Sequence, residues 1–146
     1  GNNAQLAALA ELTELEPFCN YHGYDIGFLG RTRRIVNASE LASTLEAALN
    51  GKARLIADSG RILRRVAVVS GGGGMDALEQ AAAAGADLLI TGELEHVMFH
   101  PAHELGIPVL ALGHYATETV GPKAVMARIR EVFGLECEFA DLPTGL

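Results

Sequence analysis

The pair His114 and Glu118 combines residue types and a spacing that could support chemistry. It follows an apolar run over residues 107–112 and precedes a segment with helical character that extends to Phe133. Side chains four residues apart lie on one face of a helix, so this imidazole and carboxylate could reach one metal ion. A metal site needs more than two ligands, and a solvated or capping pair is the alternative. The position beyond a predicted strand favours function, because functional groups in open α/β sheets gather at the carboxyl ends of strands.

A glycine-rich turn over residues 71–74 is a second candidate site, between a predicted strand and a predicted helix. Glycines there let backbone N–H groups approach an anion, and the helix N-terminus adds a favourable field. Glu93 follows the next strand, about where a dinucleotide-binding fold holds a ribose-binding acid. The third glycine of that fingerprint is missing, and no Lys-Ser/Thr pair follows as in a P-loop. A dinucleotide site and a tight turn that allows close packing both remain open.

Glu93 has a second possible role, because it stands at the end of a strand beside the strand that precedes His114. We predict it as a catalytic residue that contacts the substrate or orients a bound water. The histidines His96, His100 and His103 are spaced for one helix face and form another possible metal set. A polar surface stripe is the alternative, and Pro101 between them predicts an interrupted helix.

Composition limits the classes of protein to which the chain can belong. A chain of 146 residues with 49% hydrophobic content can bury one core, so residues 1–146 are predicted to form a single α/β region. The net charge of −7 argues against a surface that coats nucleic acid. Arginines near residues 31–34 and 61–65 are then solvated charges, with phosphate binding as the alternative. Two distant cysteines and the lack of any apolar run near ~20 residues predict a cytoplasmic protein without a membrane helix.

The elements that must position these residues alternate between strands and helices. A hairpin is expected around Gly23, and Asn2 or Asn3 is expected to cap the first helix. Pro122 is tolerated only in a first turn, so the last helix is predicted to begin nearer Gly121. Continuous Val, Ile and Leu runs between helices predict a three-layer α/β/α sandwich with a mostly parallel sheet. The predicted helices are 4–15, 39–49, 75–84, 95–105 and 117–133, and the predicted strands are 18–21, 24–29, 53–57, 66–69, 87–91, 107–112 and 135–139.

Five motifs in succession carry a resemblance to a known family. They are GNNAQLA (1–7), VAVVSGG (66–72), GADLLITGE (85–93), GHYATE (113–118) and DLPTGL (141–146). Each motif is weak alone, but their order is specific and covers nearly the whole chain. The sequence resembles the NIF-three-like family, known as dinuclear-metal-centre hexameric proteins or GTP cyclohydrolase I type 2 homologues.

The resemblance implies paired α/β domains assembled as a toroidal homohexamer, with two metal ions between the domains. In the family an early His-His pair, an Asp, and a late His and Glu hold the metals, and the late pair corresponds to His114 and Glu118. The early ligands have no counterpart in this sequence. We therefore expect residues 1–146 to be the later part of a longer two-domain chain, and loss of most of the site is the alternative. Zinc, iron, manganese and nickel all suit histidine with carboxylate.

The function implied by this resemblance is hydrolysis at a dinuclear metal centre. Two divalent ions can deprotonate a water and clamp a phosphate or a polarised ring carbon. The expected substrate is a small nucleotide-like, phosphate-bearing or purine-bearing molecule, and cyclohydrolase activity rests on the family label alone. A non-catalytic metal-binding ring scaffold and a dinucleotide-binding module are the alternatives.

Overall fold

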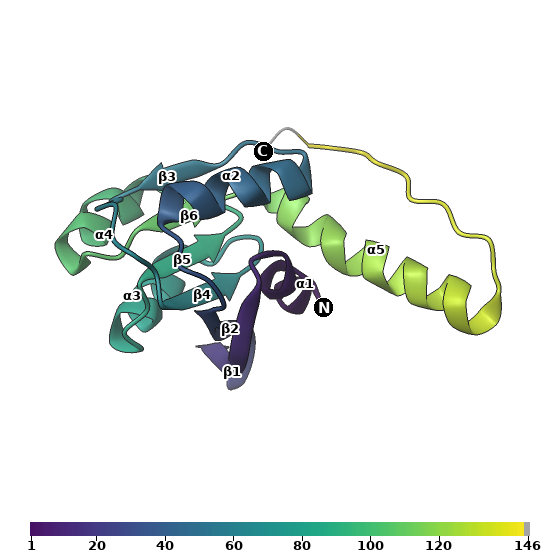
Figure 1. Cartoon of the computed structure of the whole chain (residues 1–146), viewed down its shortest axis with the longest axis horizontal. Coiled ribbons are helices and arrows are strands. Elements are labelled where there is room, and N and C mark those ends of the chain that lie inside the picture. The colour runs from purple at the N-terminus through teal and green to yellow at the C-terminus, as the bar shows by residue number, and fades with distance from the viewer. Residues whose placement is uncertain (145–146) are drawn as a thin grey trace.

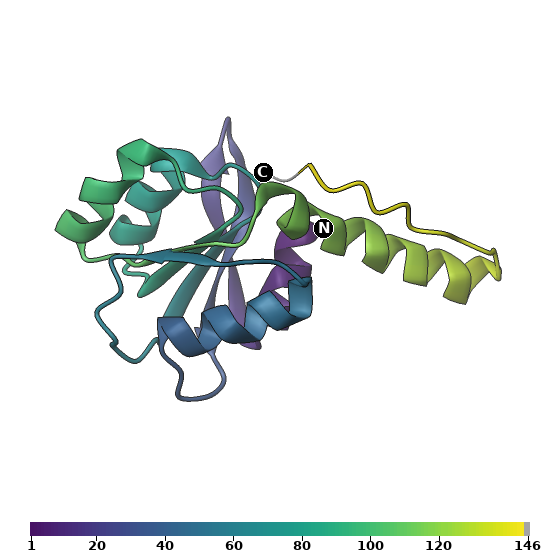
Figure 2. The ribbon, with the colours of Figure 1, turned by 90° about the horizontal axis from the view of Figure 1, so that it is seen from above.

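The computed structural model describes residues 1–144 and shows a six-stranded sheet between two layers of helices (Figures 1 and 2). The predicted α/β/α architecture is confirmed. The elements in chain order are α1 (Asn2–Leu9), β1 (Leu12–Tyr21), β2 (Tyr24–Thr32), α2 (Ala38–Leu49), β3 (Arg54–Ile56), β4 (Arg65–Val69), α3 (Gly74–Ala83), β5 (Leu88–Thr91), the 3-10 turn η1 (His96–Met98), α4 (Phe99–Leu105), β6 (Val109–Ala111) and α5 (His114–Phe133).

The sheet is mixed, where a mostly parallel sheet was predicted. Its strand order is β1-β2-β4-β5-β6-β3, and only the neighbouring pairs β4–β5 and β5–β6 are parallel. The pairs β1–β2, β2–β4 and β3–β6 are antiparallel. A two-residue turn at His22 and Gly23, both with positive φ, joins β1 to β2, and so short a connection permits only antiparallel pairing. The predicted hairpin around Gly23 is therefore confirmed.

Alternating side chains of the buried strands build two cores, one on each face of the sheet. In β4, Val66 and Val68 face the layer formed by α1 and α2. Ala67 and Val69 face the opposite layer, formed by α3 and α4. Figure 2 shows these layers on either side of the sheet. Burial on both faces explains why the parallel strands are continuous apolar runs in the sequence.

The first helix is shorter than predicted, since α1 ends at Leu9 and residues 12–15 lie in β1. Leu12 continues the apolar spacing of the helix, but it is buried as a strand residue opposite Thr32. Glu11 and Glu14 have positive φ values of 52° and 51°, which a right-handed helix cannot accommodate. The prediction of a helix over residues 4–15 is therefore wrong after Leu9.

The last helix is longer than predicted, because α5 begins at His114 and contains Pro122 in its interior. Gly113, with φ of 92°, is the N-cap of α5, and this backbone conformation allows the helix to begin at the next residue, His114. Pro122 removes one helical hydrogen bond, yet the helix, 20 residues long in total, continues to Phe133 and projects away from the sheet (Figure 2). Within residues 1–144, neither α5 nor any other helix combines the length and the apolar character that crossing a bilayer requires.

Residues 135–144, here called the return segment, form no strand, so the predicted strand over 135–139 is wrong. The segment runs back beside α5 towards the sheet (Figures 1 and 2). Both edges of the sheet lie elsewhere, so these residues have no strand with which to pair. The end of the closing DLPTGL motif, residues 145–146, lies outside the described residues.

Helix ends are set by local chemistry close to the predicted positions. α2 is capped by Asn37, two residues before the predicted Ser39, through a reciprocal capping box with Glu40. Its C-cap Asn50 is left-handed, as the predicted Asn-Gly stop requires. The predicted helix over 95–105 is divided into η1 and α4.

Candidate metal centre

Three neighbouring glycines, here called the floor of the candidate site, lie at the carboxyl ends of the parallel strands. They are Gly71 after β4, Gly92 after β5 and Gly113 after β6. The N–H of Gly92 donates to the carbonyl of Gly71 at 2.9 Å, and the N–H of Gly113 donates to the carbonyl of Gly92 at 2.9 Å. A Cβ on Gly92 would stand only 2.8 Å from the Gly71 oxygen. The three connections can therefore meet only if this position is glycine.

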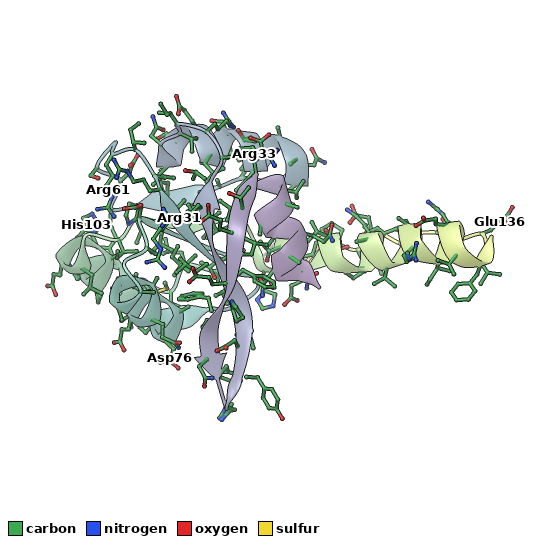
Figure 3. All side chains as sticks on the ribbon, turned by 60° about the horizontal axis from the view of Figure 1, so that its bottom comes forward. Arg31, Arg33, Arg61, Asp76, His103 and Glu136 are labelled. Carbon is green, nitrogen blue, oxygen red and sulfur yellow. The ribbon has the colours of Figure 1, made fainter. Side chains whose placement is uncertain are left out.

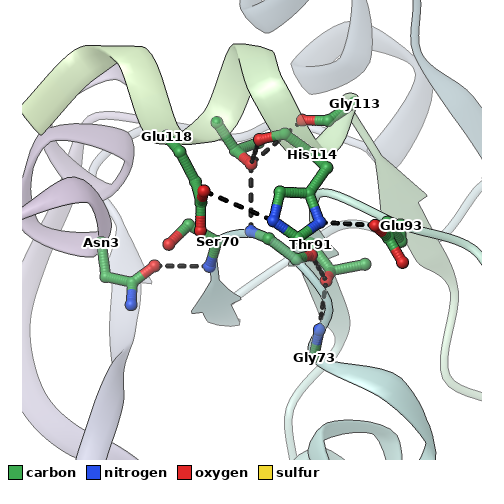
Figure 4. Close-up of polar contacts among 10 residues, drawn as sticks. Asn3, Ser70, Gly73, Thr91, Glu93, Gly113, His114 and Glu118 are labelled. Atoms are coloured by element: carbon green, nitrogen blue, oxygen red, sulfur yellow. Dashed lines mark hydrogen bonds and ion pairs between the residues drawn. The ribbon is translucent and has the colours of Figure 1, made fainter. Parts of the chain in front are cut away.

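Two fully buried threonines tie the floor together (Figure 4). The Thr117 hydroxyl accepts from the Gly71 N–H at 3.1 Å and lies 2.9 Å from the His114 carbonyl, which can accept its proton. The Thr91 hydroxyl donates to the Gly71 carbonyl at 3.2 Å and accepts from the Gly73 N–H at 3.3 Å. Sequence reasoning missed both residues, although Thr91 is conspicuous as the polar end of an apolar strand.

Two asparagines of α1 hold the flanks of the site instead of capping that helix, whose N-cap is Gly1. Asn3 accepts from the N–H of Ser70 at 2.6 Å and donates to a carbonyl of β2, so it anchors the turn after β4 (Figure 4). Asn2 accepts from the N–H of Gly121 at 2.8 Å, inside α5. The expectation that either asparagine caps α1 is wrong, and the structure gives both a positioning role.

The three residues predicted for the site come together above this floor (Figure 4). His114 is the first residue of α5, and Glu118 follows one turn later on the same face. Glu93 reaches the imidazole from the loop after β5. His114 Nδ1 lies 2.5 Å from Glu93 Oε1, and His114 Nε2 lies 3.3 Å from Glu118 Oε2. All three side chains are about half exposed, so the group opens to solvent.

The donor set suits a divalent ion. Because an ionised carboxylate can only accept, Nδ1 donates to Glu93, and a neutral ring with its proton there presents the Nε2 lone pair to Glu118. Two acceptors 3.3 Å apart require a proton or a cation between them. Two ligand atoms about 2.0–2.1 Å from a tetrahedral ion are themselves about 3.3 Å apart. A histidine whose second nitrogen contacts a carboxylate is the usual arrangement at metal sites.

A metal ion bound to His114 and Glu118 would need further ligands from outside this group of residues. Within residues 1–144, no group of three or more His, Cys, Asp or Glu side chains is arranged to hold a metal ion. That finding includes His96, His100 and His103, which the structure does not bring together as a metal set. The His103 ring instead contacts the Phe99 carbonyl and the Phe99 ring within α4, at the side of the molecule away from α5 (Figure 3).

A cavity of about 660 Å³ opens beside the three site residues. Its wall includes Tyr115, whose hydroxyl donates to Asp141 at 2.9 Å and accepts from the Leu142 N–H at 2.7 Å. Desolvation raises the pKa of the Tyr115 phenol, and the Asp141 carboxylate acts in the same direction. The cavity is lined by Glu93, His114, Tyr115, Glu118, Thr119, Pro122, Phe139, Ala140, Leu142 and Thr144.

Carboxylates surround the glycine-rich turn over residues 71–74. A Cβ on Gly71 would stand 2.7 Å from a Glu118 oxygen, and one on Gly74 would stand 3.0 Å from a Glu95 oxygen. The N–H groups of Gly71 and Gly73 already donate to threonine hydroxyls. Negative charge and occupied donors both oppose an anionic ligand. The geometry favours the tight-turn interpretation over a dinucleotide site.

Saturating NAD is therefore expected to leave the melting temperature of the protein unchanged. A ligand that binds only the folded state raises stability in proportion to the logarithm of its concentration over its Kd. Differential scanning fluorimetry with millimolar NAD measures this, with a divalent metal ion as the parallel addition. A saturable upward shift with NAD would contradict the expectation and restore the dinucleotide-binding alternative.

The fold and site define an α/β protein with a histidine–carboxylate group at the carboxyl ends of parallel strands. Residues 1–144 match the family Duf34/NIF3 (NGG1p interacting factor 3), so the chain belongs to that family. It is 44% identical over 147 residues to a "GTP cyclohydrolase 1 type 2 homolog" of Pyrococcus horikoshii, covering 100% of this chain and 58% of that protein. A Deinococcus radiodurans protein with the same description is 41% identical, covering 100% of this chain and 55% of that protein.

A solved structure gives the same result. The structure described as "protein ybgI, unknown function" has a TM-score of 0.86 and 36% identity, covering 99% of this chain and 56% of that one. The resemblance to the NIF-three-like family is thus confirmed. The chain spans a little over half the length of the curated relatives named above.

Proposed function

We propose that the protein is part of a metal-dependent hydrolase, in which His114 and Glu118 are metal ligands at a centre of two divalent ions. The observation that carries this proposal is the 3.3 Å approach of His114 Nε2 to Glu118 Oε2, with the other ring nitrogen held by Glu93. Zinc, iron, manganese and nickel all suit this donor set.

Each of the three residues has a distinct task under this proposal. Glu93 accepts the Nδ1 proton, which fixes the ring plane and makes Nε2 the ligand atom. Glu118 supplies a carboxylate oxygen, held one helical turn from His114 by α5. When bound, divalent ions supply a water of lowered pKa and polarise a phosphoryl or carbonyl group. Glu93, predicted as a catalytic residue, is proposed to act by positioning His114, which its carboxylate contacts.

We propose that the remaining ligands lie in a region equivalent to the part of the longer relatives that this chain does not match. His114 and Glu118 are two ligands, fewer than a closed or catalytic site uses. The Pyrococcus and Deinococcus relatives extend beyond the matched region, which covers 58% and 55% of their lengths. Their description as cyclohydrolase homologues supports a small nucleotide-like or other phosphate- or purine-bearing substrate.

Our second proposal is that copies of the protein assemble into a ring. The non-catalytic function that goes with it is that of a metal-binding scaffold. The far half of α5 projects from the sheet (Figure 1). It carries apolar side chains that residues 1–144 leave exposed. Phe133 is 70% exposed and Val125 59% exposed. Exposed apolar surface of this kind typically marks an interaction site, so it supports self-association into the homohexamer that the family resemblance implies.

Elemental analysis combined with native mass spectrometry on one dialysed sample tests both proposals. About two divalent ions per chain are expected for a polypeptide of the relatives' length, and weaker retention for residues 1–146, which supply fewer ligands. The same spectrum gives the number of copies in the assembly. Absence of metal from both polypeptides would contradict the hydrolase proposal. A monomer at micromolar concentration in both would contradict the ring.

A further inference from the structure

The return segment is fastened to α5 at three places. Arg130 donates to a carbonyl of the segment, and Lys123 Nζ lies 4.6 Å from the centre of the Phe139 ring. Tyr115 makes the third attachment through its hydroxyl. The three helix residues are spaced eight and seven apart, close to two turns each, so they lie along one side of α5. The segment is thus held along the helix and ends at the candidate site.

The attachment at Tyr115 joins the segment directly to the metal-ligand region. The hydroxyl donates to the Asp141 carboxylate and accepts from the Leu142 N–H, so both of its hydrogen-bonding functions are used on the segment. Tyr115 follows His114 in the sequence, and both line the same cavity. The position of the segment and the position of the imidazole are therefore set by adjacent residues of one helix.

The lining of the cavity beside the site combines ionisable, polar and apolar residues. The site residues Glu93, His114 and Glu118 line it, and Tyr115, Thr119 and Thr144 add hydroxyl groups. Most of the apolar lining comes from the return segment, through Phe139, Ala140 and Leu142, and α5 contributes Pro122. A volume of about 660 Å³ is in the range of small-molecule sites, which are mostly apolar with a few polar groups. The cavity fits a molecule with a polar reacting end and an apolar body.

Phe139 is the aromatic residue best placed to receive that body. Lys123 lies over its ring, which restrains the side chain without covering it completely. The ring is only partly buried, and it lines this cavity as well as an adjoining one of about 590 Å³ along α5. A restrained aromatic ring that faces an open cavity provides a stacking surface for another flat ring.

We propose that the return segment is the specificity wall of this site and that it selects compounds carrying a planar ring. The ring of the compound lies against Phe139, and its polar end reaches His114 and Glu118. This inference rests on the proposed function in one respect only, which is that the polar end of the compound reacts at the metal ligands. The preference for a ring depends on the apolar wall and can be measured without turnover.

Calorimetric binding of guanosine 5′-monophosphate and ribose 5-phosphate tests the proposal, because these probes share a sugar and a phosphate and differ by the base. The protein saturated with one divalent ion is expected to bind the nucleotide at least about tenfold more tightly. Phe139→Ala is expected to remove about tenfold of nucleotide affinity and to leave the ribose phosphate unchanged. Phe139→Tyr keeps the ring and should retain the preference.

Phe99→Ala is the matched control, since Phe99 is a partly exposed phenylalanine of α4 that lines neither cavity. Equal affinity of the wild-type protein for the two probes would overturn the proposal, as would no detectable binding of either at millimolar concentration. Equal effects of Phe139→Ala and Phe99→Ala would also overturn it. Ring preference together with absence of metal from a polypeptide of the relatives' length would contradict the hydrolase proposal alone, and retained metal without ring preference would contradict this inference alone.

Discussion

Replacing His114 with alanine is expected to reduce metal retention to background and hydrolysis by at least about a hundredfold. The imidazole is the neutral ligand of the pair, and its removal leaves Glu93 and Glu118 as like charges without the group between them. Glu93→Gln keeps the size of the side chain but weakens the hold on Nδ1. A loss of about 10–100-fold in metal affinity is expected for such a change in the ligand's partner.

Metal per chain, measured by elemental analysis beside circular dichroism, separates ligand loss from unfolding. His103→Ala is the matched control, because His103 is an exposed histidine of α4 outside the site. It should keep both metal and activity. Full metal retention by His114→Ala, or hydrolysis by thoroughly metal-depleted wild-type protein, would contradict the proposed centre.

Gly92→Ala is expected to lower the free energy of unfolding by about 3 kcal/mol and to weaken metal retention together with it. The added Cβ would stand 2.8 Å and 2.9 Å from the oxygen and nitrogen of Gly71 and 2.7 Å from the Thr117 hydroxyl. Backbone atoms of a neighbouring turn cannot rotate away as a flexible side chain can. Separation of the turns would move the residues that present Glu93 and His114.

Thermal unfolding measures the loss, which corresponds to a fall in Tm on the order of 10 °C for a domain of this size. Gly51→Ala is the control, because its Cβ would meet nothing closer than 3.7 Å and its backbone is not left-handed. A Gly92→Ala protein with the stability of Gly51→Ala would show that the floor of the site is less rigid than described.

The parallel strands and the proximity of Glu93, His114 and Glu118 could be predicted from sequence because one physical rule governs both. Buried parallel strands read as continuous apolar runs, so β4, β5 and β6 were recognisable. Their carboxyl ends must lie at one edge of the sheet, which brings Glu93 near His114 and Glu118 although 21 and 25 residues separate them in sequence.

The remaining errors arise where tertiary contacts override local pattern. Leu12 has helical spacing but is buried in a strand, and the predicted strand over 135–139 has no pairing partner. Pro122 is accommodated inside α5, whose neighbouring Gly121 donates to Asn2, a residue distant in sequence. Local propensity cannot anticipate such partners. The roles of Thr91 and Thr117 were missed for the same reason, because the role of a hydroxyl depends on the backbone groups to which it hydrogen-bonds in the folded chain.

Both edges of the sheet carry features that oppose the addition of a further strand. At one edge, the register of β1 shifts between Thr13 and Glu16, and the N–H and carbonyl of Asn20 are already bonded to the side chain of Gln80. At the other edge, β3 has only three residues. Exposed strand edges are where native proteins aggregate or exchange strands, and short or bulged edges oppose this. These features oppose the joining of copies of this protein sheet to sheet.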